Sequence, residues 1–212
     1  YSKMTTRIPL AERLRPRSIV NYVGQRHLLA EDAVLYNAIL RKNVPSMILW
    51  GPPGVGKTSL AFLIAKELDR PFFSLSAIKS GVKEVREVIE KAEQLQNFNQ
   101  EQPILFIDEI HRFSKSQQDS LLGAVERGLV TLIGATTENP SFEVISALLS
   151  RCQVYVLESL NKDDLIGLVN KAVKEDEFLK NDKIIIKEFD ALLRISGGDA
   201  RKLLNVLELV VN

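Results

Sequence analysis

One stretch of the chain decides its fold: Ser46-Met-Ile-Leu-Trp-Gly-Pro-Pro-Gly-Val-Gly-Lys-Thr58. It joins a short apolar run to a complete G-x-x-x-x-G-K-[ST] pattern, and apolar residues follow at helical spacing over 57–69. We therefore expect a buried strand over 46–50, a phosphate-binding loop over Gly51–Thr58 and a helix over 57–69. The glycines let the backbone curl so that its N–H groups point at phosphate oxygens, and the helix N-terminus adds positive charge.

This loop predicts a site for ATP and Mg²⁺. Lys57 is expected to reach the β- and γ-phosphates, and Thr58 to offer its hydroxyl to Mg²⁺. The expected nucleotide-binding residues of the loop are Gly51, Pro52, Pro53, Gly54, Val55, Gly56, Lys57, Thr58 and Ser59.

A second motif lies about fifty residues further on, in Ile104-Leu-Phe-Ile-Asp-Glu109. Its continuous apolar run is typical of a strand buried on both faces, which delivers two carboxylates to its carboxyl end. We expect Asp108 to hold Mg²⁺ through the water shell of the ion and Glu109 to orient and polarise the attacking water.

A third group of polar residues follows the strand expected over 130–135. Thr137 is predicted to hydrogen-bond the γ-phosphate or the attacking water, and Asn139 is the alternative. His111 is better explained as a polar residue after a strand than as a catalytic base or ligand. Trp50 is better explained as a core aromatic than as a platform for base stacking.

Working outward from these motifs, strands alternate with helices, which indicates an α/β fold with a parallel sheet covered on both faces. The other strands are expected over 72–75 and 153–157, and the other helices over 82–95, 115–126, 161–175, 187–195 and 199–211. The strand signal stops near Leu157. We therefore divide the chain into a basic N-terminal segment (1–20), an α/β core (21–158) and a small helical lid domain (159–212).

Composition limits the remaining possibilities. The chain has 212 residues and a formal net charge of +1, with 45% hydrophobic and 26% charged residues, as in ordinary globular proteins. The single cysteine excludes an internal disulfide and a cysteine-based zinc site, and two histidines are too few for a His-rich metal site. No apolar run is long enough for a membrane helix, and no signal peptide opens the chain, so we expect a cytoplasmic location. Residues 1–45 carry eight basic and three acidic side chains, which fit either contact with phosphate or a solvated linker.

Several further stretches carry a resemblance to a known family. They are Asp108-Glu-Ile-His-Arg112, Phe113-Ser-Lys-Ser-Gln-Gln-Asp119, Gly134-Ala-Thr-Thr-Glu-Asn-Pro-Ser141, Ser146-Ala-Leu-Leu-Ser-Arg151 and Gly197-Gly-Asp-Ala-Arg201. With the phosphate-binding loop, they resemble the RarA/MgsA group of replication-associated AAA+ ATPases, the bacterial relatives of Werner-helicase-interacting protein. The resemblance runs from about Pro9 to the end of the chain.

The resemblance implies roles for four more residues. Ser150-Arg151-Cys152 is similar to an arginine-finger motif, so Arg151 would reach a γ-phosphate bound to the neighbouring subunit. Arg201 matches the second sensor, on a lid helix that faces the nucleotide. Tyr22 and Val23 match the segment that lies against adenine, although core packing explains them equally well.

The family implies an ATP-hydrolysing AAA+ motor or switch in replication-fork maintenance, recombination and DNA damage tolerance. Its expected partners are forked, gapped or single-stranded DNA, single-strand binding protein and further copies of the chain in a homo-oligomer. A clamp-loader subunit, a Holliday-junction branch-migration motor and a nucleotide-sensing scaffold without turnover remain alternatives; the intact Glu109 argues against the scaffold. The family continues into an oligomerisation domain that this sequence does not cover, so we expect the chain to be the core of a longer protein.

Overall fold

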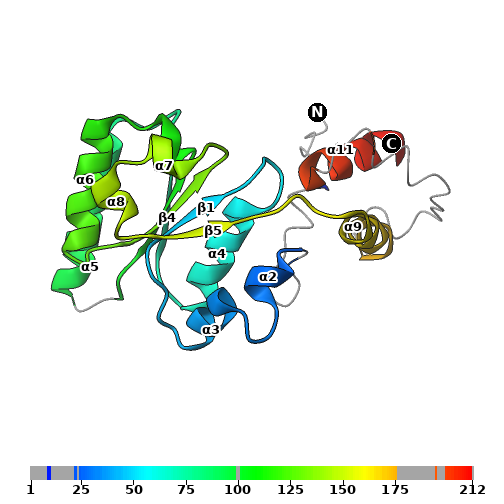
Figure 1. The fold of residues 1–212 in the computed structure, drawn as a ribbon, viewed down its shortest axis with the longest axis horizontal. Coiled ribbons are helices and arrows are strands. Elements are labelled where there is room, and N and C mark those ends of the chain that lie inside the picture. Colours follow the sequence, from blue (N-terminus) through cyan, green and yellow to red (C-terminus); the bar gives the residue numbers. More distant parts are fainter. Residues whose placement is uncertain are drawn as a thin grey trace, which may run out of the picture.

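The computed structural model describes residues 9–10, 22, 24–98, 101–175, 194 and 199–211. Its centre is a five-stranded sheet in the order β2-β3-β4-β1-β5, in which every pair is parallel (Figure 1). The strands are β1 (Met47–Trp50), β2 (Phe72–Ser76), β3 (Ile104–Asp108), β4 (Thr131–Thr136) and β5 (Gln153–Val156). The α/β class predicted from the sequence is confirmed.

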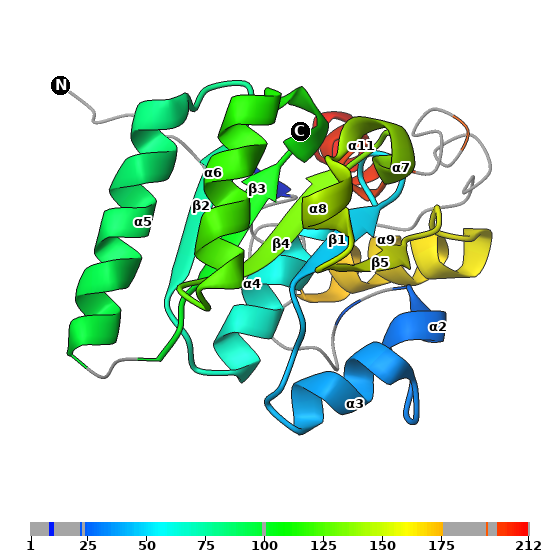
Figure 2. The same cartoon turned by 60° about the vertical axis from the view of Figure 1, so that its left-hand side comes forward.

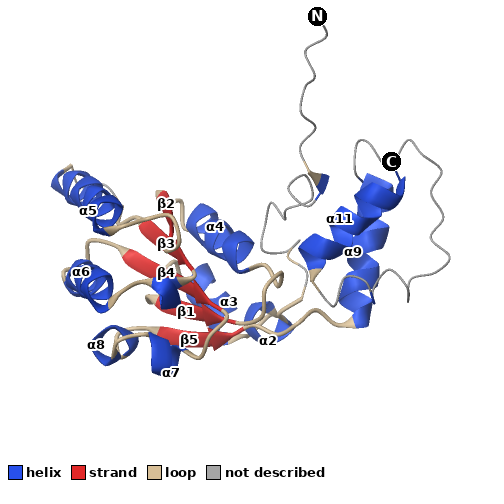
Figure 3. Cartoon of the chain, turned by 90° about the horizontal axis from the view of Figure 1, so that it is seen from above, coloured by secondary structure: helices blue, strands red, loops and turns tan. Residues whose placement is uncertain are grey.

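Helices cover both faces of the sheet, as the view from above shows (Figure 3). On one face lie α2 (Arg26–Leu29), α3 (Val34–Leu40) and α4 (Lys57–Glu67). On the other lie α5 (Val82–Asn97), α6 (Lys115–Glu126) and α8 (Ser146–Leu149). The turned cartoon shows α5 and α6 side by side along the sheet (Figure 2). Short elements η2 (Ile110–Arg112) and α7 (Pro140–Glu143) follow β3 and β4.

The three central strands, β3, β4 and β1, are buried on both faces, as is usual in a parallel sheet covered by helices. Every residue of β4 is buried, as are Ile104–Ile107 of β3 and Met47–Leu49 of β1. Strands with no solvent-facing side need apolar side chains throughout, which is the pattern of their sequences. The edge strand β5 differs, since Val154 and Val156 are 39% and 49% exposed.

A second apolar cluster lies beyond the sheet. Helix α9 (Lys162–Glu175) packs against α11 (Ala200–Val211), and Leu10 from the N-terminal region joins them. Figure 1 shows this helical pair at the end of the molecule to which β5 runs. The helix expected over 187–195 lies outside the described residues, apart from residue 194, and the domain boundaries remain predictions.

The helices α2, α3, α7, α8 and η2 were not predicted from the sequence. None of them is longer than seven residues, so helical periodicity has too few turns to show in the sequence. Among the described helices, none has the length and apolar character that crossing a membrane requires.

Candidate nucleotide-binding site

The phosphate-binding loop leaves the middle of the sheet between two neighbouring strand ends. Gly51 N donates to Thr136 O at the end of β4 over 3.1 Å, and Leu157 N, just after β5, donates to Trp50 O over 2.7 Å. A Cβ built on Gly51 would lie 2.6 Å from Leu157 O, so only glycine fits at this crossing. The loop then enters α4, whose N-terminus points its free N–H groups at the loop.

Lys57 lies over this loop. Its Nζ donates to Gly51 O at 2.5 Å and to Pro52 O at 2.9 Å. Burial lowers the pKa of Lys57, while the negative charges of Asp108 and Glu109 partly oppose that shift. The amine therefore stands within the electrostatic reach of both carboxylates of the second motif.

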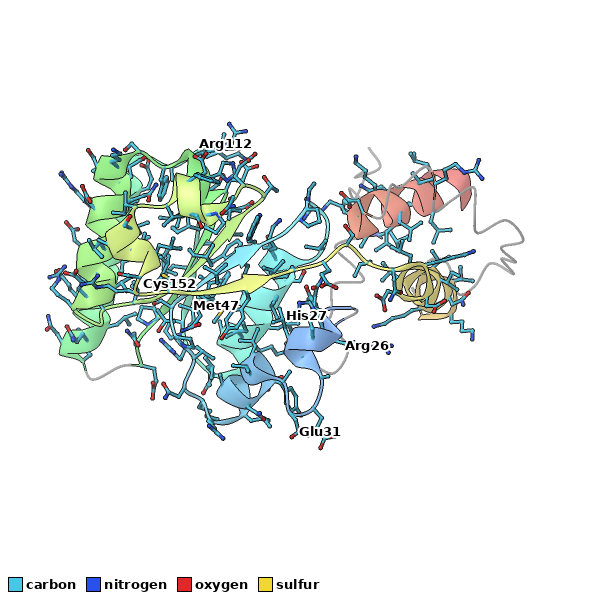
Figure 4. The ribbon with its side chains drawn as sticks, in the orientation of Figure 1. Arg26, His27, Glu31, Met47, Arg112 and Cys152 are labelled. Carbon is cyan, nitrogen blue, oxygen red and sulfur yellow. The ribbon has the colours of Figure 1, made fainter. Side chains whose placement is uncertain are left out.

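Asp108 ends β3, and Glu109 turns the chain away from the sheet. Glu109 has φ 54°, a left-handed conformation that a non-glycine residue rarely adopts. Its Oε2 lies 3.3 Å from Arg112 Nε, an ion pair, and has no hydrogen-bond partner among the described residues. Figure 4 shows Arg112 at the outer end of the fold, beside α6 and α7.

Buried Ile110 anchors the turn that carries Glu109. A Cβ built on Gly134 of β4 would lie 2.9 Å from Ile110 Cδ1, so the absence of a side chain at Gly134 leaves space for Ile110. The arrangement fixes the position of the carboxylate relative to the neighbouring strand.

At the end of β4 the buried hydroxyl belongs to Thr136, which is 1% exposed. Its Oγ1 lies 2.9 Å from His111 Nδ1 and accepts from Glu138 N at 2.9 Å. Thr137 is exposed, and Asn139 Oδ1 accepts from Ser141 N as the cap of α7. The role given to Thr137, or to Asn139, remains a prediction.

This Thr136–His111 contact was not predicted from the sequence. No local pattern in the sequence marks this contact, because both faces of β4 are buried.

Tyr22 touches the loop from outside the sheet. Its hydroxyl lies 2.9 Å from both Val55 O and Gly56 O, and burial raises the pKa of Tyr22. A Cβ built on Gly56 would lie 2.5 Å from Tyr22 Oη. Val23 lies outside the described residues.

Gln25, also unforeseen, ties this N-terminal region to the segment after β5. Its Nε2 donates to Glu158 O at 2.7 Å, and Glu158 N donates to its Oε1 at 2.9 Å. Next to it, His27 Nε2 lies 2.7 Å from Val156 O, and Figure 4 shows this side chain pointing from α2 toward β5.

The two predicted arginines lie in different places. Arg151 follows α8 and is bound within its own chain, to Glu126 Oε1 and to Ala147 O, each at 2.8 Å. Arg201 is exposed in the first turn of α11, and the preceding residue, Ala200, donates its N–H to Gly54 O of the loop over 3.3 Å. Of the two, only Arg201 is therefore carried by an element that contacts the loop.

The residues present fit ATP with Mg²⁺. The described part of the chain holds no group of three or more His, Cys, Asp or Glu side chains that could bind a metal. Mg²⁺ needs no such group, because it keeps several waters and takes one or two protein oxygens together with phosphate. The Thr58 hydroxyl is a ligand of that kind, and the Asp108 carboxylate suits the water shell of the ion. Positive φ at Gly54 and Gly56 gives the loop its curl.

Comparison with known proteins agrees with this geometry. Residues 47–160 match the ATPase family associated with various cellular activities (AAA). Over 207 residues, the chain is 47% identical to replication-associated recombination protein A of Escherichia coli strain K12, covering 96% of this chain and 46% of that protein. It is 44% identical over 205 residues to ATPase WRNIP1 of Dictyostelium discoideum, covering 96% and 23%.

A solved structure is also similar. The Thermotoga maritima RuvB Holliday junction branch migration motor superimposes with a TM-score of 0.72 at 28% identity, over 94% of this chain and 65% of that one. The family resemblance drawn from the sequence motifs is confirmed by these identities. The chain spans less than half the length of the two curated relatives.

Proposed function

The chain belongs to the ATPase family associated with various cellular activities, and from that premise we propose that its site binds ATP with Mg²⁺ and hydrolyses the γ-phosphate. The observation that carries the proposal is the convergence of the loop, Lys57, Asp108 and Glu109 at the carboxyl ends of β1 and β3. Ligands of open α/β sheets bind at this edge.

Each side chain has a separate task in this proposal. Lys57 leaves the carbonyls of Gly51 and Pro52 and binds the phosphates, whose charge replaces those two hydrogen bonds. Thr58 and Asp108 would hold Mg²⁺, which supplies positive charge to the phosphate oxygens as the bond breaks. Glu109 orients the attacking water, and Thr137 or Asn139 contacts that water or the γ-phosphate.

Two arginines complete the proposed site. Arg201 binds phosphate from the lid helix α11. Arg151 enters the site of a neighbouring copy, where such a residue contributes roughly 10³- to 10⁵-fold to the rate. Tyr22 and Val23 are proposed to flank the nucleotide base.

We propose the cellular role from the curated relatives. Because the chain is 47% identical to replication-associated recombination protein A, the proposed role is an ATP-driven activity at damaged or stalled replication forks. The proposed partners are forked, gapped or single-stranded DNA, single-strand binding protein and further copies of the chain in a homo-oligomer. The proposed location is the cytoplasm, at the nucleoid if the source is bacterial.

The chemistry is tested by two substitutions in the intact protein. Glu109→Gln should keep ATP affinity and nearly abolish turnover, because the amide fits the same space but polarises water poorly. Lys57→Ala should lose ATP affinity itself, because the lysine binds the ground-state phosphates as well as the transition state.

ATP affinity and steady-state turnover should be measured for each variant with and without forked, gapped and single-stranded DNA. Unchanged affinity in Lys57→Ala would remove the loop as the nucleotide site, and normal turnover in Glu109→Gln would remove Glu109 from the mechanism. An ATP turnover rate that is the same with and without each DNA would contradict the fork role, but it would not contradict ATP hydrolysis.

A branch-migration motor is the second candidate, and the TM-score of 0.72 to RuvB favours it. We rank it lower because the identity to that motor is 28%, against 47% to the recombination protein. Migration of a four-way DNA junction, driven by the intact protein and ATP, would reverse the ranking.

A further inference from the structure

Asp199 brings the helical pair α9–α11 into contact with the phosphate-binding loop. A Cβ built on Gly54 would lie 2.1 Å from Asp199 Cγ, and Ala200 N donates to Gly54 O over 3.3 Å. Gly54 also has φ +78°, which strains any other residue. The carboxylate therefore rests in the space that a side chain at position 54 would take.

The same carboxylate is fixed to the lid helix. Asp199 Oδ1 accepts from Lys202 N at 3.1 Å, and Asp199 O accepts from Leu203 N at 2.9 Å, so the residue caps the start of α11. Buried Leu203 and Leu207 pack α11 onto α9. The negative charge at the loop is thus fixed to the helical pair. A displacement of Asp199 also displaces Arg201, which lies in the first turn of α11.

A carboxylate at this position opposes the ligand that the loop is built to hold. The loop N–H groups, the α4 N-terminus and Lys57 all attract an anion. A fixed negative charge in contact with the same loop repels that anion, and at partly buried separations of several ångströms such a repulsion changes affinity on the order of three- to tenfold.

We propose that Asp199 is a positioning residue that couples the lid to nucleotide binding: its contact with Gly54 and the binding of nucleotide phosphates weaken each other. The inference rests on the proposed nucleotide site and adds a residue and a direction to it. Because coupling between two equilibria is reciprocal, phosphates loosen the Asp199–Gly54 contact by the same factor by which that contact lowers nucleotide affinity.

The matched variants are Asp199→Asn and Asp163→Asn. Asparagine at 199 keeps the shape and an oxygen that caps α11, and removes the charge. Asp163 lies exposed in the first turn of α9, so its replacement removes one negative charge from the same helical pair away from the contact. ADP is the probe, because its binding is not complicated by turnover.

Calorimetry on the intact protein should show ADP binding about three- to tenfold more tightly to Asp199→Asn and unchanged to Asp163→Asn. In the wild type, saturating ADP should speed hydrogen exchange of the Ala200 amide, whose bond to Gly54 is released. The inference would be overturned if ADP bound Asp199→Asn no more tightly than wild type, or if both variants gained the same affinity. It would also be overturned if ADP did not speed hydrogen exchange of the Ala200 amide. A wild type that binds no ADP would instead overturn the proposed function, and the inference with it.

Discussion

Lys57 shows how one residue links burial to ligand chemistry. Its amine is partly buried against two carbonyls of its own loop, and this burial lowers its pKa from the ordinary value of 10.5. Bound phosphates would favour the protonated amine and raise the pKa again. In the proposed site, nucleotide binding would therefore be linked to the protonation of this side chain.

This linkage predicts a pH dependence of ADP affinity. Above the lowered pKa of free Lys57, binding takes up a proton, so ADP affinity should fall as the pH rises toward the ordinary lysine pKa of 10.5. The decline should begin below the pH at which an ordinary lysine titrates, and calorimetry in two buffers of different ionisation heat should record the proton uptake.

Lys57→Arg is the matched control, because a guanidinium stays charged across this range. Its ADP affinity, whatever its absolute value, should be flat with pH. A wild-type profile equally flat would show that Lys57 is fully protonated in the free protein throughout the range.

At the residue scale, sequence patterns located the loop and the two acids but not the contacts around them. Lys57, Asp108 and Glu109 were predicted because their motifs have fixed spacing next to an apolar strand, and their roles remain predictions. The contact of Thr136 with His111 was not predicted, because a hydroxyl pair at a strand end does not reveal which side chain faces inward. The Asp199–Gly54 contact joins residues 145 positions apart, which no local pattern encodes.

At the scale of elements, buried Gln118 holds α6 to the segment between α7 and α8. Its Nε2 donates to Phe113 O and to Glu143 O, each at 3.1 Å, and its Oε1 accepts from Ile145 N at 2.8 Å. The side chain is 2% exposed. One amide thus satisfies three backbone groups, two of which, Glu143 O and Ile145 N, lie on the path from β4 to Arg151.

Gln118→Ala should lower the free energy of unfolding by about 2 to 4 kcal/mol. The substitution opens a small cavity and leaves one buried and two partly buried backbone groups without their side-chain partner, each costing roughly 1–3 kcal/mol where water cannot enter. Urea denaturation should show a lower midpoint at an unchanged slope. Gln94→Ala, on the exposed face of α5, is the control and should stay within about 0.5 kcal/mol of wild type. A loss for Gln118→Ala no larger than that of the control would mean that water replaces the amide.

The long elements were predictable and the short ones were not. The strands β1, β3 and β4 are buried on both faces, and their apolar runs show this directly. Helices α5 and α6 were expected over 82–95 and 115–126 and extend over Val82–Asn97 and Lys115–Glu126. The segments α7 and α8 owe their form to tertiary contacts such as those of Gln118, so the sequence alone did not reveal them.

For the molecule as a whole, the position of Arg151 bears on assembly. The residue is bound by Glu126 at 2.8 Å on the α6 side of the sheet, and both side chains are 43% exposed. An ion pair this exposed contributes at most about 1 kcal/mol, so Glu126 can release the arginine readily. Since none of the described contacts of Arg151 reaches the loop, we expect Arg151 to act on the nucleotide of another copy.

This arrangement predicts that two inactive variants restore each other when mixed. Assemblies of Arg151→Ala alone lack the finger at every interface, and assemblies of Glu109→Gln alone lack the catalytic acid at every site. In a random equal mixture joined through head-to-tail interfaces, roughly a quarter of the sites pair an intact Glu109 with an intact Arg151 from the neighbour. Turnover of the intact protein should then rise well above the mean of the two parents, and specific activity should increase with protein concentration.

A second mixture separates this explanation from a general effect of mixing. Glu109→Gln and Lys57→Ala damage the same site and both keep Arg151, so no interface between them carries a complete set and their mixture should stay inactive. Since the finger is worth roughly 10³- to 10⁵-fold, a quarter of the sites restored stands far above that background. Recovery confined to the first mixture would place Arg151 in trans. A first mixture that never exceeds the average of its parents, under conditions where subunits exchange, would mean that Arg151 serves its own chain or stays with Glu126.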